Sequence, residues 1–143
     1  MRPIRPASPA GPSGGRHPHA DDHLRIARPT RDLDAAERFW VDGLGLGVLW
    51  RTEGEHALVM VGWPEAAWHL ELVADPSAAP PSPTDEDLLV LYLDEELPEE
   101  LHARLLAAGG RRVRARNPYW EEHGRTYEDP DGYRLVLSTR AWP

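Results

Sequence analysis

The sequence predicts an α+β fold built from two βαβββ modules, each with a curved mixed sheet, around a shared cavity. Two observations support this prediction: strand-like and helix-like segments follow the same order in both halves, and a proline-rich stretch separates the halves. Size is the third, because a chain of 143 residues suits one domain, whereas a half of roughly 50 residues buries a sheet face poorly on its own. We therefore expect the halves to pair, with helices on one side of each sheet and the concavity on the other.

The first half opens with a strand in which Leu24 and Ile26 alternate with polar residues. A helix should follow, because Asp34 and Glu37 are spaced like a capping box and Gly43 is a stop signal. The predicted elements of this half are a strand at 23–28, a helix around 33–44, and strands at 48–53, 57–62 and 68–74.

The second half repeats this order after the proline-rich stretch. Pro98 stands where a first helical residue is expected, and Glu99 and Glu100 suit the positive end of the helix dipole. The segment Asp129-Pro130-Asp131-Gly132 predicts a hairpin turn, and turn chemistry explains its carboxylates better than catalysis does. The predicted elements are a strand at 88–93, a helix at 98–108, and strands at 111–116, 125–128 and 133–139.

Composition shifts give the domain boundaries. Residues 1–21 are rich in proline, glycine and serine and are expected to form a disordered tail. Residues 22–143 then form a single domain, with module 1 at 22–75, a linker at 76–85 and module 2 at 86–143.

Composition and charge exclude several classes of function. The chain has no cysteine and no lysine, which excludes a disulfide framework, a thiol nucleophile and Schiff-base chemistry. A net charge of −8 argues against nucleic acid and against an anionic membrane surface as partners. No apolar run is long enough for a signal peptide or a membrane span, so we expect a cytoplasmic protein.

Two motifs resemble those of a known superfamily. The first runs from Arg28-Pro29-Thr30-Arg31-Asp32-Leu33-Asp34 through Phe39-Trp40 to Gly43-Leu44-Gly45-Leu46, and the second is the segment from Glu128 to Leu137. Together they resemble the vicinal oxygen chelate superfamily, which includes glyoxalase I, bleomycin-resistance proteins and extradiol dioxygenases. The likeness covers about residues 23–139 and implies the paired-module fold and, commonly, a homodimer. It specifies the activity poorly, because many functions share this fold.

The resemblance also implies four positions for a metal ion, in the first and last strands of each module. They fall on Arg25, Glu71, Leu88 and Val136, of which only Glu71 could ligate a metal. Three protein ligands are the usual minimum for a catalytic metal, so we predict no metal and no other cofactor. A register shift of two residues would bring in His69 or His23, which keeps a divalent metal open as an alternative.

Strand parity predicts what the cavity contains instead. Arg25, His69, Glu71, Tyr92 and Arg134 should line its walls. Arginine can hold a carboxylate or phenolate and stack on rings. The pair of His69 and Glu71 offers a candidate general base. The alternative interpretation is that Glu71 only neutralises a neighbouring arginine.

The segment 117–124 lacks a strand pattern but carries Tyr119 and Trp120, which could form a lid over the cavity or a structural loop that plugs the core. Arg112, Arg114 and Arg116 alternate on one predicted strand, either as an anion grip or as the solvated face of an edge strand.

The sequence thus predicts a metal-independent protein of the bleomycin-resistance type that sequesters an aromatic, possibly anionic, small molecule and has a role in antibiotic resistance. The predicted ligand-binding residues are Arg25, His69, Glu71, Tyr92, Tyr119, Trp120 and Arg134. The first alternative is a lyase, isomerase or dioxygenase of the glyoxalase kind, with His69 and Glu71 as candidate catalytic residues. The second is a dimeric interaction module without a ligand.

Overall fold

The computed structural model describes residues 14–143, and the larger part of the predicted tail lies outside them. Residues 14–23 contain no helix or strand, and Arg16 forms an ion pair with Asp22 there. Module 1 contains β1 (Leu24–Pro29), α1 (Leu33–Glu37), a π-helical turn η1 (Arg38–Gly43), β2 (Gly47–Thr52), β3 (Ala57–Gly62) and β4 (Trp68–Ala74). Module 2 contains β5 (Leu88–Tyr92), α2 (Glu99–Ala107), β6 (Arg111–Val113), α3 (Pro118–Glu122), β7 (Gly124–Glu128) and β8 (Arg134–Ser138).

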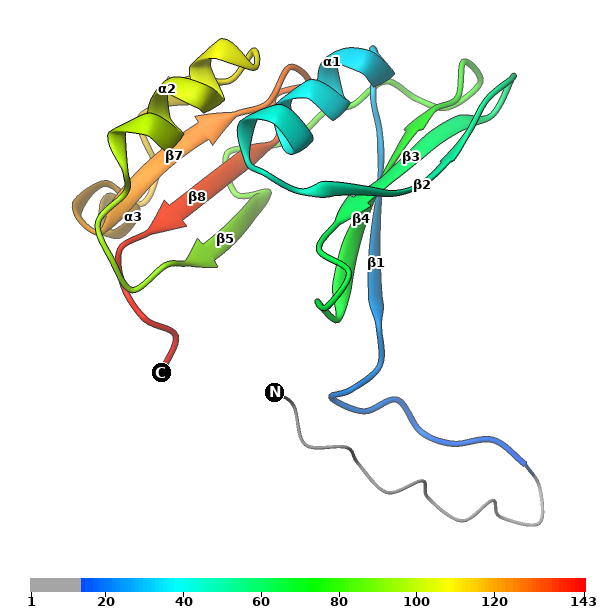
Figure 1. Cartoon of the computed structure of the whole chain (residues 1–143), viewed down its shortest axis with the longest axis horizontal. Helices are drawn as coiled ribbons and strands as arrows, with labels where there is room; N and C mark the ends of the chain where they lie inside the picture. The colour runs from blue at the N-terminus through cyan, green and yellow to red at the C-terminus, as the bar shows by residue number, and fades with distance from the viewer. Residues whose placement is uncertain (1–13) are drawn as a thin grey trace.

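The two modules have the same sheet topology (Figure 1). Sheet A has the strand order β1-β4-β3-β2, and sheet B has the order β5-β8-β7-β6. In each sheet the first strand pairs in parallel with the last, and the remaining pairs are antiparallel. The predicted α+β fold with two mixed sheets is therefore confirmed.

One core joins the modules. Phe39 and Trp40 of η1 pack in the same cluster as Val59 and Leu70 of sheet A and Leu135 of sheet B. The alternating residues of both sheets thus turn toward the helices, and each sheet turns its other face away from this core. We call these other faces open face A and open face B.

The two motifs that carry the superfamily resemblance meet at the junction between the modules. The side chain of Asp131 accepts hydrogen bonds from Thr30 Oγ1, at 2.5 Å, and from the backbone N–H of Arg31, at 3.0 Å. Asp129 accepts one from Trp40 Nε1, at 3.2 Å, and closes its own turn through the N–H groups of Asp131 and Tyr133. The turn prediction for the two carboxylates is confirmed, and each carboxylate also binds module 1.

Three local predictions were wrong. Asp32, not Asp34, caps α1, because its carboxylate accepts from the N–H of Ala35. The strand predicted at 111–116 ends at Val113, which pairs with Thr126. The segment 117–124, for which we expected a lid or a structural loop, contains the short helix α3, which Asn117 caps.

Within residues 14–143, no helix is both long and apolar enough to cross a membrane.

Candidate functional site

Four polar residues meet on open face A, where the parallel strands β1 and β4 lie side by side. Arg25 faces His69 across the two strands, and Glu71 follows on the same face two residues later. A guanidinium nitrogen of Arg25 lies 3.4 Å from Glu71 Oε1, and Arg25 Nε donates to His69 Nε2 at 3.2 Å. His23, just before β1, places its Nε2 2.6 Å from His69 Nδ1. Arg25, His69 and Glu71 thus share one face of sheet A, as strand parity requires, and their place in the wall of a cavity stays a prediction.

The contacts of His69 determine its tautomer. Arg25 Nε can only donate, so His69 Nε2 must accept and the ring proton sits on Nδ1. That proton then points at His23 Nε2, which must accept it. Burial lowers the pKa of His69, and the neighbouring His23 and Arg25 lower it further, which favours the neutral imidazole that these contacts require. Both of its ring nitrogens are thus engaged, and neither is free to take a proton from a substrate.

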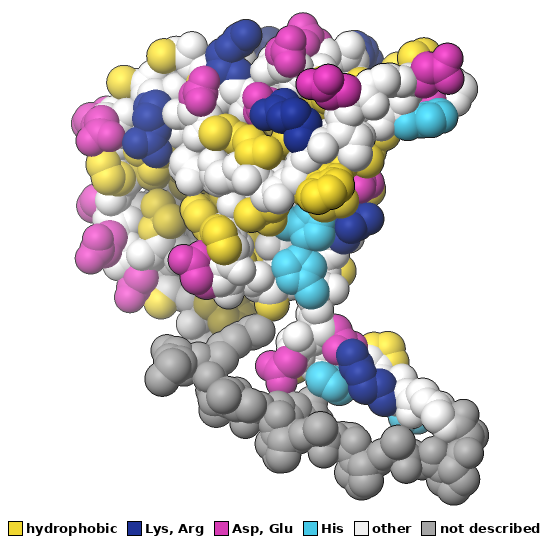
Figure 2. All heavy atoms as spheres, turned by 45° about the vertical axis from the view of Figure 1, so that its right-hand side comes forward, with side chains coloured by type: hydrophobic (Ala, Val, Ile, Leu, Met, Phe, Trp, Pro, Cys, Tyr) yellow, Lys and Arg dark blue, Asp and Glu magenta, His cyan; other side chains and the backbone are white. Residues whose placement is uncertain are grey.

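Arg25 is the accessible member of this cluster. Its side chain is 52% exposed, whereas that of Glu71 is only 12% exposed. Figure 2 shows adjoining histidine side chains beside a basic side chain and hydrophobic groups on the surface of the molecule. Among the hydrophobic neighbours are Met60, whose Sδ lies 3.9 Å from Arg25, and Leu49, which packs near His69 over Gly62. The face therefore offers one cation surrounded by apolar and aromatic groups.

Open face B carries an aromatic surface instead. Tyr92, at the end of β5, contacts Trp120 of α3 at a centroid distance of 6.1 Å and Trp142 of the C-terminal segment at 5.4 Å. Tyr119 contacts Trp120 at 5.0 Å and His123 at 4.8 Å. We call the five rings Trp142, Tyr92, Trp120, Tyr119 and His123 the aromatic belt. Sequence reasoning found three of them and missed Trp142 and His123, which no strand or helix periodicity assigns to a face.

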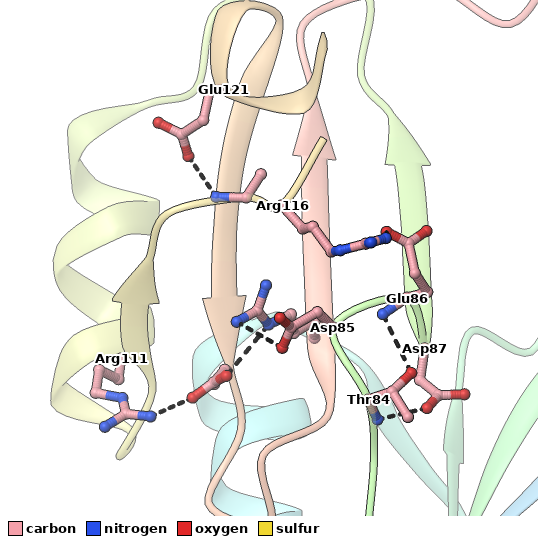
Figure 3. A network of polar contacts seen from close by, with 10 residues as sticks. Thr84, Asp85, Glu86, Asp87, Arg111, Arg116 and Glu121 are labelled. Carbon is pink, nitrogen blue, oxygen red and sulfur yellow. Dashed lines mark hydrogen bonds and ion pairs between the residues drawn. The ribbon is translucent and has the colours of Figure 1, made fainter. Parts of the chain in front are cut away.

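The other end of open face B is charged, and its charges are paired (Figure 3). Arg134, only 11% exposed, contacts Glu128 at 3.2 Å and Asp85 at 3.3 Å. Arg116 reaches across to Glu86 at 2.9 Å. Arg134 is therefore engaged with two carboxylates and is much less accessible than Arg25.

Strand β6 forms the edge of sheet B, and its arginines Arg111 and Arg112 are exposed, as is Arg114 after it. Of the three predicted alternating arginines only Arg112 lies on the edge strand, whereas Arg114 follows it exposed to solvent and Arg116 pairs with Glu86.

The predicted site residues therefore form two groups, one on each open face. Arg25, His69 and Glu71 form the first, and Tyr92, Tyr119, Trp120 and Arg134 lie on the second. Within residues 14–143, no hydrogen bond, ion pair or ring contact joins the two groups. His23 is the residue of the first group that sequence reasoning did not commit to, although its alternation with Arg25 is visible in the sequence.

The residues at the four metal positions do not fit a metal ion. Arg25 is a cation without a free lone pair, Leu88 and Val136 have no donor, and Glu71 is paired with Arg25. Among residues 14–143, no group of three or more His, Cys, Asp or Glu side chains could hold a metal.

Comparisons with known proteins agree with the fold and its motifs. Residues 24–73 match the model of the YycE-like N-terminal domain, and residues 86–139 match that of the YycE-like C-terminal domain. The chain is 37% identical over 118 residues to the uncharacterized protein YycE of Bacillus subtilis (strain 168), covering 80% of this chain and 85% of YycE. It is also similar to the crystal structure of B. subtilis YycE, with a TM-score of 0.75 and 31% identity over 94% of this chain and 98% of that one.

Two further solved structures share the fold. TnmS3, an antibiotic binding protein from Streptomyces sp. CB03234, matches with a TM-score of 0.59 and 25% identity over 87% of this chain and all of that chain. Glyoxalase I of Leishmania major matches with a TM-score of 0.61 and 20% identity over 80% of this chain and 84% of that one, which shows the fold alone. The chain belongs to the YycE-like family, within the vicinal oxygen chelate superfamily of glyoxalases and bleomycin-resistance proteins.

Proposed function

We propose that this protein binds and sequesters an aromatic, anionic small molecule without a metal ion, in the manner of the bleomycin-resistance proteins. The observation that carries the proposal is Arg25: a half-exposed cation stands at a position where the resemblance places a metal ligand. A guanidinium binds carboxylates and phenolates through paired hydrogen bonds and stacks on flat rings. The hydrophobic groups around it add apolar contact area for such a ring.

The chemistry of His69 favours binding over catalysis. Its Nε2 accepts from Arg25 and its Nδ1 proton points at His23, so it positions the guanidinium rather than acting as a general base. Similarity to TnmS3, whose description names it an antibiotic binding protein, gives independent support for a small-molecule ligand. A role in antibiotic resistance would follow if the ligand is an antibiotic.

The proposal includes a homodimer. In one chain the cation of open face A and the aromatic belt of open face B are separate, and a second copy could bring one against the other to close a shared cavity. Large exposed hydrophobic residues support an association of this kind: Leu24, Val48, Leu49, Trp50 and Trp63. Sedimentation velocity should then give about twice the chain mass of 16.1 kDa, and a monomer at all concentrations would contradict the dimer. The cytoplasmic location stays a prediction.

Ligand binding can be tested by following tryptophan fluorescence during titration with aromatic carboxylates, phenolates and aromatic antibiotics. Arg25→Met, which keeps the length of the side chain and removes its charge, should weaken binding about tenfold or more. Arg114→Met changes an exposed arginine outside both groups and serves as the control. The proposal fails if no compound of the panel binds, or if Arg25→Met binds as tightly as Arg114→Met.

Metal independence needs its own measurement. Binding should be unchanged after dialysis against EDTA, and elemental analysis of protein purified without a chelator should find no stoichiometric divalent ion. Glyoxalase-type turnover that EDTA abolishes and a divalent ion restores would favour the lyase or isomerase alternative instead.

A further inference from the structure

The aromatic belt on open face B is larger than a single small-molecule contact requires. Its five rings come from three separate parts of module 2, namely β5, α3 and the C-terminal segment, and each ring touches the next. Trp142 is 74% exposed and Tyr119 41% exposed. Tyr92, Trp120 and His123 between and beside them are half-buried. A run of contacting rings that reaches the surface at two places can bind an extended partner.

Of the polar ring groups of the belt, His123 Nε2 lies 3.7 Å from Glu122, and within the described residues the other four make no hydrogen bond. Within residues 14–143, neither indole N–H of Trp120 and Trp142 donates a hydrogen bond, and neither phenol of Tyr92 and Tyr119 makes one. By contrast, the indole N–H of Trp40 donates to a carboxylate and that of Trp63 to a backbone carbonyl. The belt therefore presents ring faces together with free donors, a combination that suits an apolar chain rich in exposed carbonyl acceptors.

A proline-rich segment in the polyproline II conformation has these properties. Its backbone carbonyls are unpaired, and every third residue lies on the same edge, about 9 Å further along. The ring centroid of Tyr92 lies 5.4 Å from that of Trp142 and 6.1 Å from that of Trp120. The three rings together therefore cover a length similar to one polyproline turn. Aromatic grooves that bind proline-rich peptides use this match.

The sequence of the chain itself contains a proline-rich segment. Residues 1–13 carry Pro3, Pro6, Pro9 and Pro12, a spacing of three throughout. The segment has two arginines and no acidic residue. A stretch of 13 residues can span up to ~45 Å, which exceeds the ~37 Å diameter expected for a spherical domain of this size.

The charges around the belt are complementary to the segment. The loop after β5 carries exposed acidic residues at 94–96, and the backbone N–H of Asp94 bonds to the carbonyl of Arg140, which fixes this loop beside the segment that carries Trp142. Helix α3 adds exposed Glu121 and Glu122 next to Trp120. Acidic groups thus outnumber Arg140, the one basic residue within these stretches.

We propose that the aromatic belt is a docking surface for a proline-rich segment, and that its occupant is residues 1–13 of the same chain. The rings would hold the proline edge, and the acidic residues on both sides would attract Arg2 and Arg5. The proposal goes beyond the small-molecule function and does not depend on it, although a ligand that uses Tyr92 or Trp120 would compete with the segment.

Because the chain has no cysteine, a single spin label can test this docking. Ser8→Cys places the label between two prolines of the segment, and the indole N–H signals of the six tryptophans report on its position in the ¹⁵N-labelled full-length protein. The signals of Trp120 and Trp142 should lose most of their intensity, while those of Trp40 and Trp63 should change little. Tryptophan-to-phenylalanine variants assign the signals.

Two matched samples complete the test. Alanine at the four proline positions, in the same labelled chain, should restore the Trp120 and Trp142 signals. A mixture of labelled ¹⁴N chains with unlabelled ¹⁵N chains should show no broadening, since the contact lies within one chain. The proposal is overturned if Trp120 and Trp142 are unaffected by the label, if the alanine variant broadens them equally, or if the mixed sample broadens as strongly as the uniform one.

Discussion

The junction between the modules makes a strong prediction about stability, centred on Asp131. This residue is only 7% exposed, and its carboxylate accepts hydrogen bonds from Thr30 Oγ1 and from the backbone N–H of Arg31. Asp131→Ala removes both acceptors at once. Hydrogen bonds to a charged group contribute about 1.5–3 kcal/mol each, and a buried donor left without an acceptor carries the full desolvation cost.

The loss of the Asp131 carboxylate affects its two donors differently. Thr30 Oγ1 lies 3.1 Å from the carbonyl of Asp32 and can turn its proton there, whereas the N–H of Arg31 has no other acceptor within the described residues. We therefore expect Asp131→Ala to lower the free energy of unfolding by about 3 kcal/mol, and Thr30→Val by about 1 kcal/mol. Asp85→Ala is the matched control: its ion pair with Arg134 is 62% exposed on the Asp85 side and should contribute at most about 0.5 kcal/mol.

Urea unfolding followed by tryptophan fluorescence and by far-ultraviolet circular dichroism measures these differences. Because one core spans both modules, the two probes should give a single transition, with an unchanged slope in the Asp131 variant. A loss below about 0.5 kcal/mol for Asp131→Ala, equal to that of the Asp85 control, would refute the argument that these bonds hold the modules together.

Two further predictions concern the same core. Burial raises the pKa of Asp129 to about 6 from the ordinary 3.8, so between these values the folded chain keeps a proton that the unfolded chain has lost. The stability that this proton contributes, about 3 kcal/mol, is present below about pH 4 and disappears as the pH rises to about 6. Asp129→Asn should remove this part of the pH dependence of urea unfolding, and an unchanged dependence of the unfolding free energy on pH would contradict the prediction. In β7, a Cβ at Gly124 would lie 2.5 Å from the carbonyl oxygen of Leu137, so Gly124→Ala should lower the free energy of unfolding by about 2 kcal/mol. Gly47→Ala in β2, where a Cβ would meet only the carbonyl oxygen of Gly62 at 3.6 Å, is the comparison, and equal stabilities would contradict the predicted clash.

The sequence could predict the sheets and one half of the candidate site because both depend on alternation. Leu70 and Leu72 turn to the core, so His69 and Glu71 must turn the other way, and the parallel partner of His69 is Arg25. Tertiary contacts decided what alternation could not. Helix α3 spans only five residues, too short for a periodic pattern, although Asn117 followed by Pro118 is a helix-start signal.

The contact of the two motifs at the junction was likewise out of reach, because Thr30 and Asp131 are 101 residues apart and each has a sufficient local explanation. Trp142 illustrates the same limit. Its place beside Tyr92 depends on how the last residues return along sheet B after Arg140, which carries no sequence pattern.

The pairing of Arg25 with Glu71 restricts which anions suit open face A. A carboxylate that displaced Glu71 from Arg25 would leave a nearly buried charge without its counterion, which is costly. An anion that instead shares the half-exposed guanidinium avoids this cost, and it gains further if it carries a hydroxyl that donates to Glu71. His69 favours the same arrangement, because its Nε2 already holds Arg25 Nε and leaves only the terminal nitrogens for a ligand. An aromatic anion with a neighbouring hydroxyl therefore satisfies the site better than a simple carboxylate, and the ratio of the two affinities measures how far Glu71 takes part in binding.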